Sequence, residues 1–416
     1  MHQYIRLKPL LTIALITFIL SSCKKDPDID PLPEIHEEPV LDESIEAIIP
    51  HIYIDIEGNQ EVVSKDDYLN ASVEIKGMEL YPDLAPVLTE IKGRGNSTWG
   101  KPKNPYKLKL DKKTSVLGLP EAKEWVLLAN YQDYTLMTNA VAMAIATQLG
   151  LPFTNTIIPV DLTINGEYRG NYNLTQQIEL KKNRVDIGDD GVLLELDTHF
   201  DEEFKFVSDA FSLPIMVKDP DVESEAHFNA IQQDFKALED KLMAEDFPNN
   251  NYGDLIDKKQ LVRYIIVNNL TGNYEINHPK SMYMHKAGGG KYVMGPVWDF
   301  DWAFGVDEQT RQYFNYSEIP LLRAGDTRKG AVFLSHFLKD PEVRTLYKSE
   351  WNAYRSGKFE GLMQFIETYA ARIRASQQKD FELWGVGNNN LPQAKADMKT
   401  YLRERAREMD VYVANL

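Results

Sequence analysis

Residues 295–305 read Gly295-Pro296-Val297-Trp298-Asp299-Phe300-Asp301-Trp302-Ala303-Phe304-Gly305. The stretch closes an apolar run with two carboxylates, Asp299 and Asp301, which bulky aromatic side chains flank. Because a carboxylate is costly to remove from water unless it is paired, hydrogen-bonded or bound to a metal, the pattern indicates either a functional site or a buried acidic pair satisfied by arginine and backbone amides. In extended backbone, side chains two apart point the same way, so the two acids could share one hard cation or hold two.

The segments before this stretch predict a helix, a polar loop and a hairpin. Residues 261–270 form an apolar helix, and the polar loop 273–280 follows it. Residues 281–286 and 291–298 then read as two strands around a glycine-rich turn, and the second strand leads into Asp299. A protein-kinase catalytic centre has the same order of parts: a loop carboxylate accepts the proton of the acceptor hydroxyl, and an aspartate after the hairpin holds magnesium on the phosphates.

A loop in the first quarter of the chain carries the groups that a phosphate needs. A strand from Glu90 leads into residues 94–99, which offer exposed amides, a guanidinium and two hydroxyls. We therefore take Arg94, Asn96 and Ser97 as candidate phosphate contacts. A tight turn with Arg94 in an internal ion pair explains the same pattern without a ligand.

The next segment, residues 106–110, alternates between apolar and basic side chains. It predicts a strand whose apolar face packs on a core and whose other face carries Lys107 and Lys109. If that face looks into a cleft, Lys107 is placed to contact nucleotide phosphates, as the strand lysine of a kinase does. If it looks into solvent, both lysines are ordinary solvated charges.

Further elements follow from alternation, turn residues and helical periodicity. Strands are predicted at 51–56, 71–77, 125–130 and 192–197, and a hairpin over 160–174 has an Asn-Gly turn. Asp133 is placed to cap a helix that runs to Gln148. Helices are also predicted at 223–245, 331–338, 341–356, 359–378 and 391–416.

Composition bounds the class of protein. The 416 residues are 43% hydrophobic and 26% charged, which is material for one large soluble domain or two. The formal net charge of −17 argues against nucleic acid as a partner, because a phosphate backbone needs a basic surface. It does not argue against a nucleotide, which needs only a local basic pocket.

The N-terminus predicts a lipid-anchored protein. Arg6 and Lys8 precede an apolar run that is too short to span a bilayer comfortably, and Leu20-Ser21-Ser22-Cys23 resembles a bacterial lipobox. We expect a lipoprotein signal peptide at 1–23, lipidation of the lone cysteine Cys23 and a disordered tether at 24–47. The body would then be extracytoplasmic, on the outer membrane, the periplasmic face or the cell surface. An ordinary cleaved signal peptide with an incidental cysteine is the alternative.

Four motifs together carry a family resemblance. The acidic stretch, residues 94–99, residues 104–109 and residues 165–172 resemble, in the same order, the CotH family of atypical secreted or surface kinases. The resemblance runs from about Ile48 to Gly305 and implies an α+β fold with an atypical protein-kinase-like core of mixed or antiparallel sheet and hairpins. It implies a CotH-like domain at 48–305, a helical extension at 306–416 packed on the same domain, and a lipoprotein member of the Bacteroidetes type.

The resemblance also implies a reaction, the Mg²⁺- and ATP-dependent transfer of a phosphoryl group to a protein hydroxyl. It makes Asp299 the principal metal ligand, beside Asp301 and Asn277, and Glu275 the base. The implied nucleotide contacts are Arg94, Asn96, Ser97, Lys107 and Gln176.

Two positions depart from the family pattern, because Gln176 stands where a glutamate often pairs with the lysine and Glu275 stands where an aspartate is usual. A non-catalytic surface binding or assembly protein that keeps the fold is therefore an alternative, with the acidic pair holding calcium or anchoring an ion pair. A glycan hydrolase using Asp299 and Asp301 is a third, although carboxylates two apart on one strand sit too close to flank a sugar bond.

Overall fold

The computed structural model describes residues 49–306, 313, 316–317, 322 and 325–416. The expected signal peptide at 1–23, its Cys23 and the tether at 24–47 lie outside these residues. Both helices and sheets are present, so the α+β class is confirmed. None of the helices in the described part of the chain is long and apolar enough to cross a membrane.

Seven strands close into a barrel in the order β1-β2-β3-β4-β5-β7-β6. All neighbours are antiparallel except β1 and β6, whose parallel pairing closes the barrel. Closure leaves no open edge, and the inward side chains form a hydrophobic cluster of their own. The strands are β1 His51–Ile56, β2 Leu69–Lys76, β3 Leu84–Gly93, β4 Tyr106–Thr114, β5 Ala122–Leu128, β6 Ile158–Ile164 and β7 Glu167–Gln176.

Local sequence explains two features of the barrel. The β6–β7 hairpin turns at Asn165 and Gly166, whose φ values of 52° and 79° are those that a tight hairpin turn requires. In β4 the side chains of Tyr106, Leu108 and Leu110 are buried inside, as alternation predicts. Closure itself was not predicted, because it depends on the pairing of β1 with β6 about 110 residues along the chain rather than on any local pattern.

A second, antiparallel sheet has the order β12-β11-β8-β10-β9. Strand β8 lies at its centre and pairs with β11, a strand that comes some 85 residues later, so that Leu196 stands opposite Met282. The strands are β8 Val192–Leu196, β9 Lys205–Val207, β10 Pro214–Asp219, β11 Met282–Lys286 and β12 Val293–Met294.

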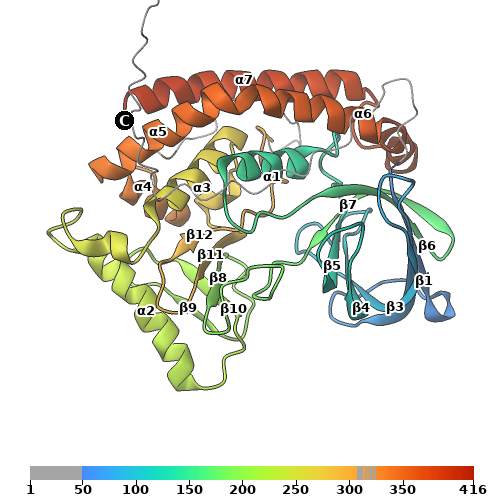
Figure 1. Cartoon of the computed structure of the whole chain (residues 1–416), viewed down its shortest axis with the longest axis horizontal. Helices are drawn as coiled ribbons and strands as arrows, with labels where there is room; N and C mark the ends of the chain where they lie inside the picture. Colours follow the sequence, from blue (N-terminus) through green and yellow to red (C-terminus); the bar gives the residue numbers. More distant parts are fainter. Residues whose placement is uncertain (1–48, 307–312, 314–315, 318–321, 323–324) are drawn as a thin grey trace, which may run out of the picture. The chain divides into compact units, whose positions relative to one another are not determined.

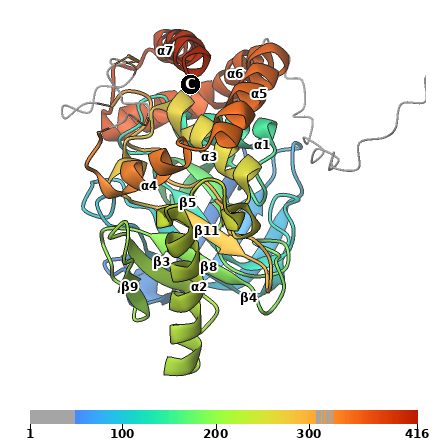
Figure 2. The same cartoon turned by 90° about the vertical axis from the view of Figure 1, so that its left-hand side faces the viewer.

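The helices pack with the second sheet into the larger hydrophobic cluster. Helix α3 contacts α1, α5 and α7, and Figure 1 shows α5, α6 and α7 lying over α1 and α3. In the side view of Figure 2, α5, α6 and α7 again lie at the top, and α2 lies in front of the second sheet and extends below it. The helices are α1 Thr138–Leu149, α2 Glu225–Met243, α3 Lys258–Thr271, α4 Lys329–Phe337, α5 Pro341–Gly357, α6 Phe359–Trp384 and α7 Leu391–Ala414.

Helix α6 is fastened to the barrel by a buried ion pair. Lys103 Nζ lies 2.5 Å from Asp380 Oδ1, and the same oxygen accepts a hydrogen bond of 2.8 Å from Asn171 N. Lys103 Nζ also donates to Asn171 O at 2.6 Å. Gly170 permits this approach, because a Cβ there would lie 2.3 Å from Asp380 Oδ1. The charges are therefore paired with each other and with the backbone.

One predicted strand is wrong in length. Residues 291–298 were expected to pair throughout, but β12 spans only Val293–Met294. Pro296 has no N–H to give to a ladder, and Gly295 takes a φ of 117°. Asp299 itself has a φ of 58°, in the left-handed region. The premise that Asp299 and Asp301 lie two apart on extended backbone is therefore wrong.

Candidate functional site

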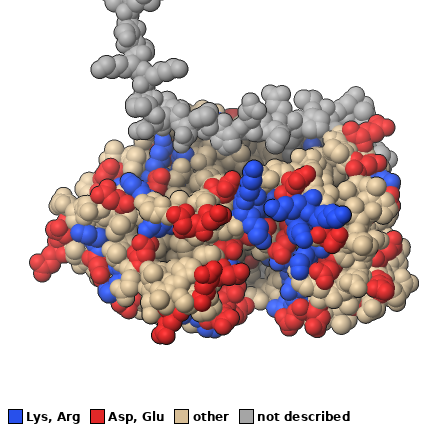
Figure 3. Space-filling model, turned by 60° about the horizontal axis from the view of Figure 1, so that its bottom comes forward, with Lys and Arg blue, Asp and Glu red and all other residues tan. Residues whose placement is uncertain are grey.

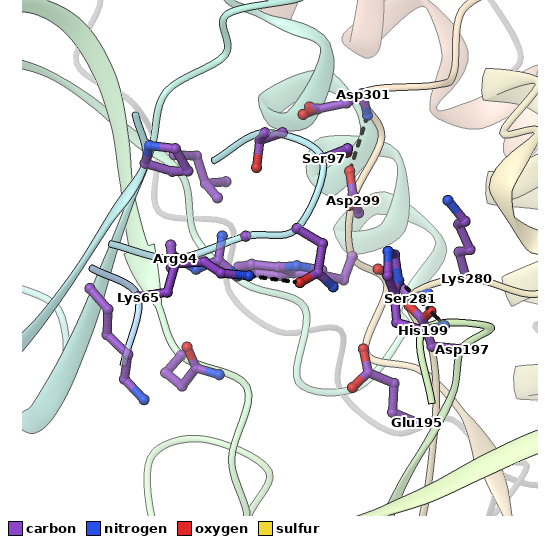
Figure 4. A pocket seen from close by; sticks show the side chains of 18 of the residues that line it. Lys65, Arg94, Ser97, Glu195, Asp197, His199, Lys280, Ser281, Asp299 and Asp301 are labelled. Atoms are coloured by element: carbon purple, nitrogen blue, oxygen red, sulfur yellow. Dashed lines mark hydrogen bonds and ion pairs between the residues drawn. The ribbon is translucent and has the colours of Figure 1, made fainter. Parts of the chain in front are cut away.

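A polar cavity of about 580 Å³ lies between the barrel and the second sheet. Its wall is made by the loop after β3, the end of β8, the loop before β11, and the acidic stretch after β12 (Figure 4). Among the predicted residues, seven line it: Arg94, Asn96, Ser97, Lys107, Glu275, Asp299 and Asp301. Figure 3 shows lysine and arginine side chains gathered near the middle of one face that also carries many acidic residues.

The loop after β3 is tight because of its glycines. A Cβ at Gly93 would lie 2.2 Å from the ring of Trp99 and would clash with it. Gly95 has a φ of 81°, and a Cβ there would lie 2.2 Å from Thr98 Oγ1, which is also too close. Asn96 and Ser97 are exposed at its tip. Because Gly93 and Gly95 have no side chains, the backbone of the loop can approach a phosphate closely.

Arg94 projects from this loop toward the acidic stretch. Its guanidinium lies over the ring of Trp298, 5.4 Å from the ring centre. Burial lowers the pKa of Arg94, although the negative charges of Asp299 and Asp301 oppose that effect. The barrel thus presents the Arg94 guanidinium to the acids, and its contact with the Trp298 ring helps to orient it.

The two aspartates are positioned by asparagine side chains. Asn139 of α1 donates from Nδ2 to Asp301 Oδ1 at 3.0 Å and accepts from Phe300 N at 3.1 Å. Asn273 Nδ2 lies 3.4 Å from Asp299 O, and Asp301 N lies 3.4 Å from Asp299 Oδ1. Asn139 thus holds the carboxylate of Asp301, and Asn273 holds the backbone of Asp299, whose carboxylate lies next to Asp301 N; none of these groups neutralises the acids.

The acids of the cavity raise one another's pKa. Burial, and then the charges of Asp299 and Asp301, raise the pKa of Glu275 to about 9. Burial, and then the charge of Asp299, raise the pKa of Asp301 to about 7. Burial also raises the pKa of Asp299, and Asp197 adds to this. More negative charge is gathered here than the surrounding cations offset, which is the electrostatic setting of a cation site.

The donor set fits a metal that is shared with a substrate. Among residues 49–306 and the described residues after them, no three His, Cys, Asp or Glu side chains converge to hold a metal ion by themselves. Magnesium is commonly bound by one or two carboxylates together with water and substrate phosphates rather than by an all-protein cage. Asp299 and Asp301 could provide such a partial set.

One buried donor at the cavity has no partner in the described structure. Asn130 lines the cavity at the end of β5, is 4% exposed and has a φ of 50°. Its Oδ1 accepts from Asn139 Nδ2 at 3.4 Å, but its Nδ2 is without a hydrogen bond among the described residues. A buried amide donor without a partner is costly, and a phosphate oxygen or water in the cavity would satisfy it.

Lys107, which lines the cavity, has a partner on the barrel, and Gln176 and Asn277 lie outside the cavity wall. Lys107 lines the cavity, and its Nζ lies 2.7 Å from Glu124 Oε2 on the neighbouring strand. Gln176 ends β7 with its carbonyl accepting from Asn155 Nδ2, and it is not part of the cavity wall, although Gln177 is. Asn277 is buried in the short 3-10 helix Glu275–Asn277 and does not line the cavity.

The second sheet adds residues that sequence reasoning missed. Lys218 Nζ lies 3.3 Å from Glu195 Oε2 and also pairs with Glu202. Asp197 bonds His199 and the backbone of Ser281. Lys218 lies on β10, and Asp197 ends the strand predicted at 192–197. No local pattern places either residue in the cavity wall, because the pairing of β8 with β10 and β11 does so.

Helix α1 begins as the polar sequence before it predicts. Asp133 Oδ2 accepts hydrogen bonds of 2.8 Å from both the backbone N and the side chain of Thr138, the first helical residue. Asp133 is therefore not the N-cap residue, which is Met137, but its carboxylate binds the first N–H of the helix from five residues earlier in the chain. Since α1 carries Asn139, this contact also helps to set the position of Asp301.

The fold and the cavity define an α+β protein with a cation-type acidic centre facing a glycine-bearing loop. A scan of family models finds one that matches residues 91–409, described as CotH kinase protein. The match covers most of the chain, from β3 to α7, so the chain belongs to the CotH kinase family. It extends past Gly305 through the C-terminal helices. A search of curated proteins gives no match to the chain.

Proposed function

We propose that this protein is a protein kinase that transfers the γ-phosphoryl group of ATP to serine or threonine hydroxyls with the help of Mg²⁺. The observation that carries the proposal is the cavity in which Arg94 and its glycine loop face three acids of raised pKa, Glu275, Asp299 and Asp301. In-line phosphoryl transfer needs positioning and charge neutralisation more than covalent help, and these groups can supply both.

The metal would be held by Asp299, with Asp301 beside it. When bound, Mg²⁺ neutralises charge on the phosphates and on the carboxylates that hold it. The unpartnered Asn130 Nδ2 and the crowded carboxylates both fit a site that is completed by a metal–phosphate unit. Asn139 orients Asp301 for this role through its 3.0 Å hydrogen bond.

The barrel side would hold the nucleotide phosphates. Arg94 would offer its guanidinium, and Asn96 and Ser97 would offer exposed amide and hydroxyl groups from the glycine loop. Lys107 would bind a phosphate oxygen after its ammonium group gives up part of its ion pair with Glu124. Because Gln176 and Asn277 are not part of the cavity wall, we do not include them in the proposed site.

The location of the reaction is a further part of the proposal. We place the body outside the cytoplasm, anchored to a bacterial membrane by a lipid on Cys23 at the end of the lipobox. The acceptor would then be a protein exposed in the same compartment. Replacing Cys23 by serine is expected to move the protein from the membrane to the soluble fraction, and retention of Cys23→Ser in the membrane would contradict the anchor.

A phosphoryl-transfer assay tests the proposed function. The full chain is incubated with γ-labelled ATP and Mg²⁺, and label is followed into the protein's own hydroxyls and into inorganic phosphate. We expect the wild type to transfer phosphate and Asp299→Asn to have a transfer rate at least about 100-fold lower. The wild-type rate should stay constant when the Mg²⁺ concentration is varied above saturation.

The matched control is Asp209→Asn, which removes an exposed carboxylate that is not part of the cavity wall. It should keep the wild-type rate. Absence of transfer in folded wild-type protein, or equal rates in Asp299→Asn and Asp209→Asn, would contradict the proposal and leave a non-catalytic binding protein.

A further inference from the structure

Asp197 and His199 form a hydrogen-bonded pair on the wall of the cavity. Strand β8 ends at Leu196, and its pairing with Met282 of β11 brings the next residue, Asp197, beside Ser281. Figure 4 shows the three side chains close together on the side of the cavity formed by the second sheet. Nothing in the proposed metal or phosphate binding uses this pair.

The aspartate of the pair is fixed by backbone contacts. Its side chain is only 7% exposed. Oδ1 accepts from His199 N at 2.7 Å and Oδ2 accepts from Ser281 N at 2.9 Å, while Asp197 N donates to Pro214 O at 3.1 Å. Two backbone N–H groups thus hold the carboxylate, a third contact fixes the backbone of Asp197, and the carboxylate can orient a ring in turn.

The hydrogen bond to the ring decides which nitrogen carries the proton. His199 Nδ1 lies 2.7 Å from Asp197 Oδ1. Because an ionised carboxylate can only accept, Nδ1 must be the donor, and in the neutral ring Nε2 then carries a lone pair. The side chain is 36% exposed, lines the cavity, and makes no hydrogen bond through Nε2 to any described residue. The lone pair is therefore available to a substrate.

Other histidines in the described chain have a different arrangement. His285 Nδ1 contacts Gly295 O, His336 Nε2 contacts Leu242 O, and His51 Nε2 contacts Thr163 Oγ1. None of these three lines the cavity, and each uses a ring nitrogen to satisfy a neighbouring group. Among the described histidines, His199 is the one that a carboxylate orients and that faces the cavity.

The pair also lies close to the reaction centre of the proposed function. The charge of Asp197 acts on both Asp299 and Glu275, which places it near the acids that would hold the metal. His199 lines the same cavity as Glu275 and Asp299, so a hydroxyl bound there beside a phosphate could reach Nε2. Histidine is the side chain that most often acts as a general base in enzymes, and a third group commonly orients it.

We propose that His199 is the catalytic base of the phosphoryl transfer, oriented by Asp197. This inference rests on the proposed function, and it assigns to His199 the role of base that the family resemblance implies for Glu275. His199 Nε2 accepts the proton of the acceptor hydroxyl as the hydroxyl oxygen forms its bond to the γ-phosphorus. The bond from that phosphorus to the β–γ bridging oxygen breaks, and its electron pair leaves with ADP. The imidazolium, whose charge Asp197 stabilises, then returns the proton to solvent.

The experiment compares His199→Ala with a matched histidine variant, His227→Ala, on helix α2 and outside the cavity. The full chain is given Mg²⁺ and γ-labelled ATP, with water and the protein's own hydroxyls as acceptors, and Mg-ATP affinity is measured by calorimetry. We expect His199→Ala to lower the transfer rate by about 10²–10⁴-fold while the Kd for Mg-ATP stays within about twofold. Added imidazole should restore part of the lost rate, because it can occupy the space left by the ring.

The outcomes separate this inference from the function on which it rests. A wild-type rate in His199→Ala, or a loss that imidazole does not restore, overturns the role of His199 while transfer by the wild type stands. A wild type that neither binds Mg-ATP nor transfers phosphate overturns both. If His199→Ala does not fold, His199→Gln takes its place: a large rate loss at unchanged affinity supports the base, and an unchanged rate overturns it.

Discussion

Two groups of buried acids in this molecule meet the cost of burial in different ways. At the junction of α6 and the barrel, Asp380 is paired with Lys103 and accepts from Asn171 N. At the cavity, the Asp301 carboxylate accepts from Asn139 Nδ2 and the Asp299 carboxylate from Asp301 N, and the charges of both acids raise the pKa of Glu275. Burial raises the pKa of Asp380 as well, but there Lys103 opposes it, whereas at the cavity neighbouring acids add to it.

The difference separates a structural cluster from a functional one. A carboxylate whose charge is already neutralised by a neighbouring lysine can stabilise the native state, but it is not available to bind a cation. Carboxylates that repel one another weaken the metal-free protein and are ready for a cation that arrives with a substrate. Substitutions should therefore have opposite effects on stability in the two places.

The largest expected effect on stability is at the buried ion pair of Lys103 and Asp380. Lys103→Ala leaves Asp380 buried without its cation, which is expected to cost about 3–5 kcal/mol of unfolding free energy. Denaturant titration measures this directly. Lys236→Ala is the control, because its pair with Asp240 is exposed, and it should give no measurable change. A loss below about 1 kcal/mol for Lys103→Ala would show that the junction does not depend on the pair.

At the cavity the sign should reverse. Asp301→Asn keeps an oxygen for Asn139 Nδ2 to donate to and removes one of the repelling charges. In metal-free buffer near pH 8 it is expected to stabilise the protein by roughly 1–3 kcal/mol, while weakening Mg-ATP binding. Denaturant titration with a chelator present, beside Asp209→Asn, tests this. Destabilisation by Asp301→Asn would mean that the acid is already satisfied.

The same acids predict a pH dependence of stability. Folded Glu275 and Asp301 have pKa values of about 9 and about 7, against about 4.3 and 3.9 in an unfolded chain. Between about pH 5 and 9 the folded state therefore binds more protons, so metal-free stability should fall as pH rises through this window. Saturating Mg²⁺ or the variant Glu275→Gln should make the fall shallower, and an unchanged slope with Glu275→Gln would contradict this origin.

The smallest effect concerns the glycine loop. Gly95→Ala places a Cβ against Thr98 Oγ1 at a φ of 81°, so the loop must shift, and affinity for Mg-ATP should drop by about tenfold, or about 1.4 kcal/mol. Gly289→Ala is a matched control, since its φ of 67° imposes a similar backbone cost but leaves open space around the Cβ. Calorimetry should show unchanged affinity for Gly289→Ala. Equal losses would mean that the loop does not contact the nucleotide.

The sequence predicted the parts whose causes are local. The Asn-Gly hairpin, the buried face of β4, helix α3 and the C-terminal helices depend on turn chemistry and periodicity within a few residues. The strand at 291–298 failed for a local reason as well, since Gly295 and Pro296 interrupt the ladder.

The rest depends on pairing between distant segments. Closure of the barrel requires β1 beside β6, and the position of Asp197 and His199 requires β8 beside β11. Such registers are chosen by the packing of the whole core and leave no spacing motif in the sequence. Asp299 and Asp301 were found because they lie among several aromatic residues in a family motif, whereas His199 lies in a mainly polar segment that matches no motif.

The most direct test of the central claim is calorimetric titration of the protein with ATP, in the presence and absence of Mg²⁺, for the wild type and Asp299→Asn. The central claim is that the cavity acids are kept for a metal that arrives with a nucleotide. It predicts binding that requires Mg²⁺ in the wild type and is lost in Asp299→Asn. Binding of equal strength with and without Mg²⁺, or no binding by folded wild-type protein, would contradict it.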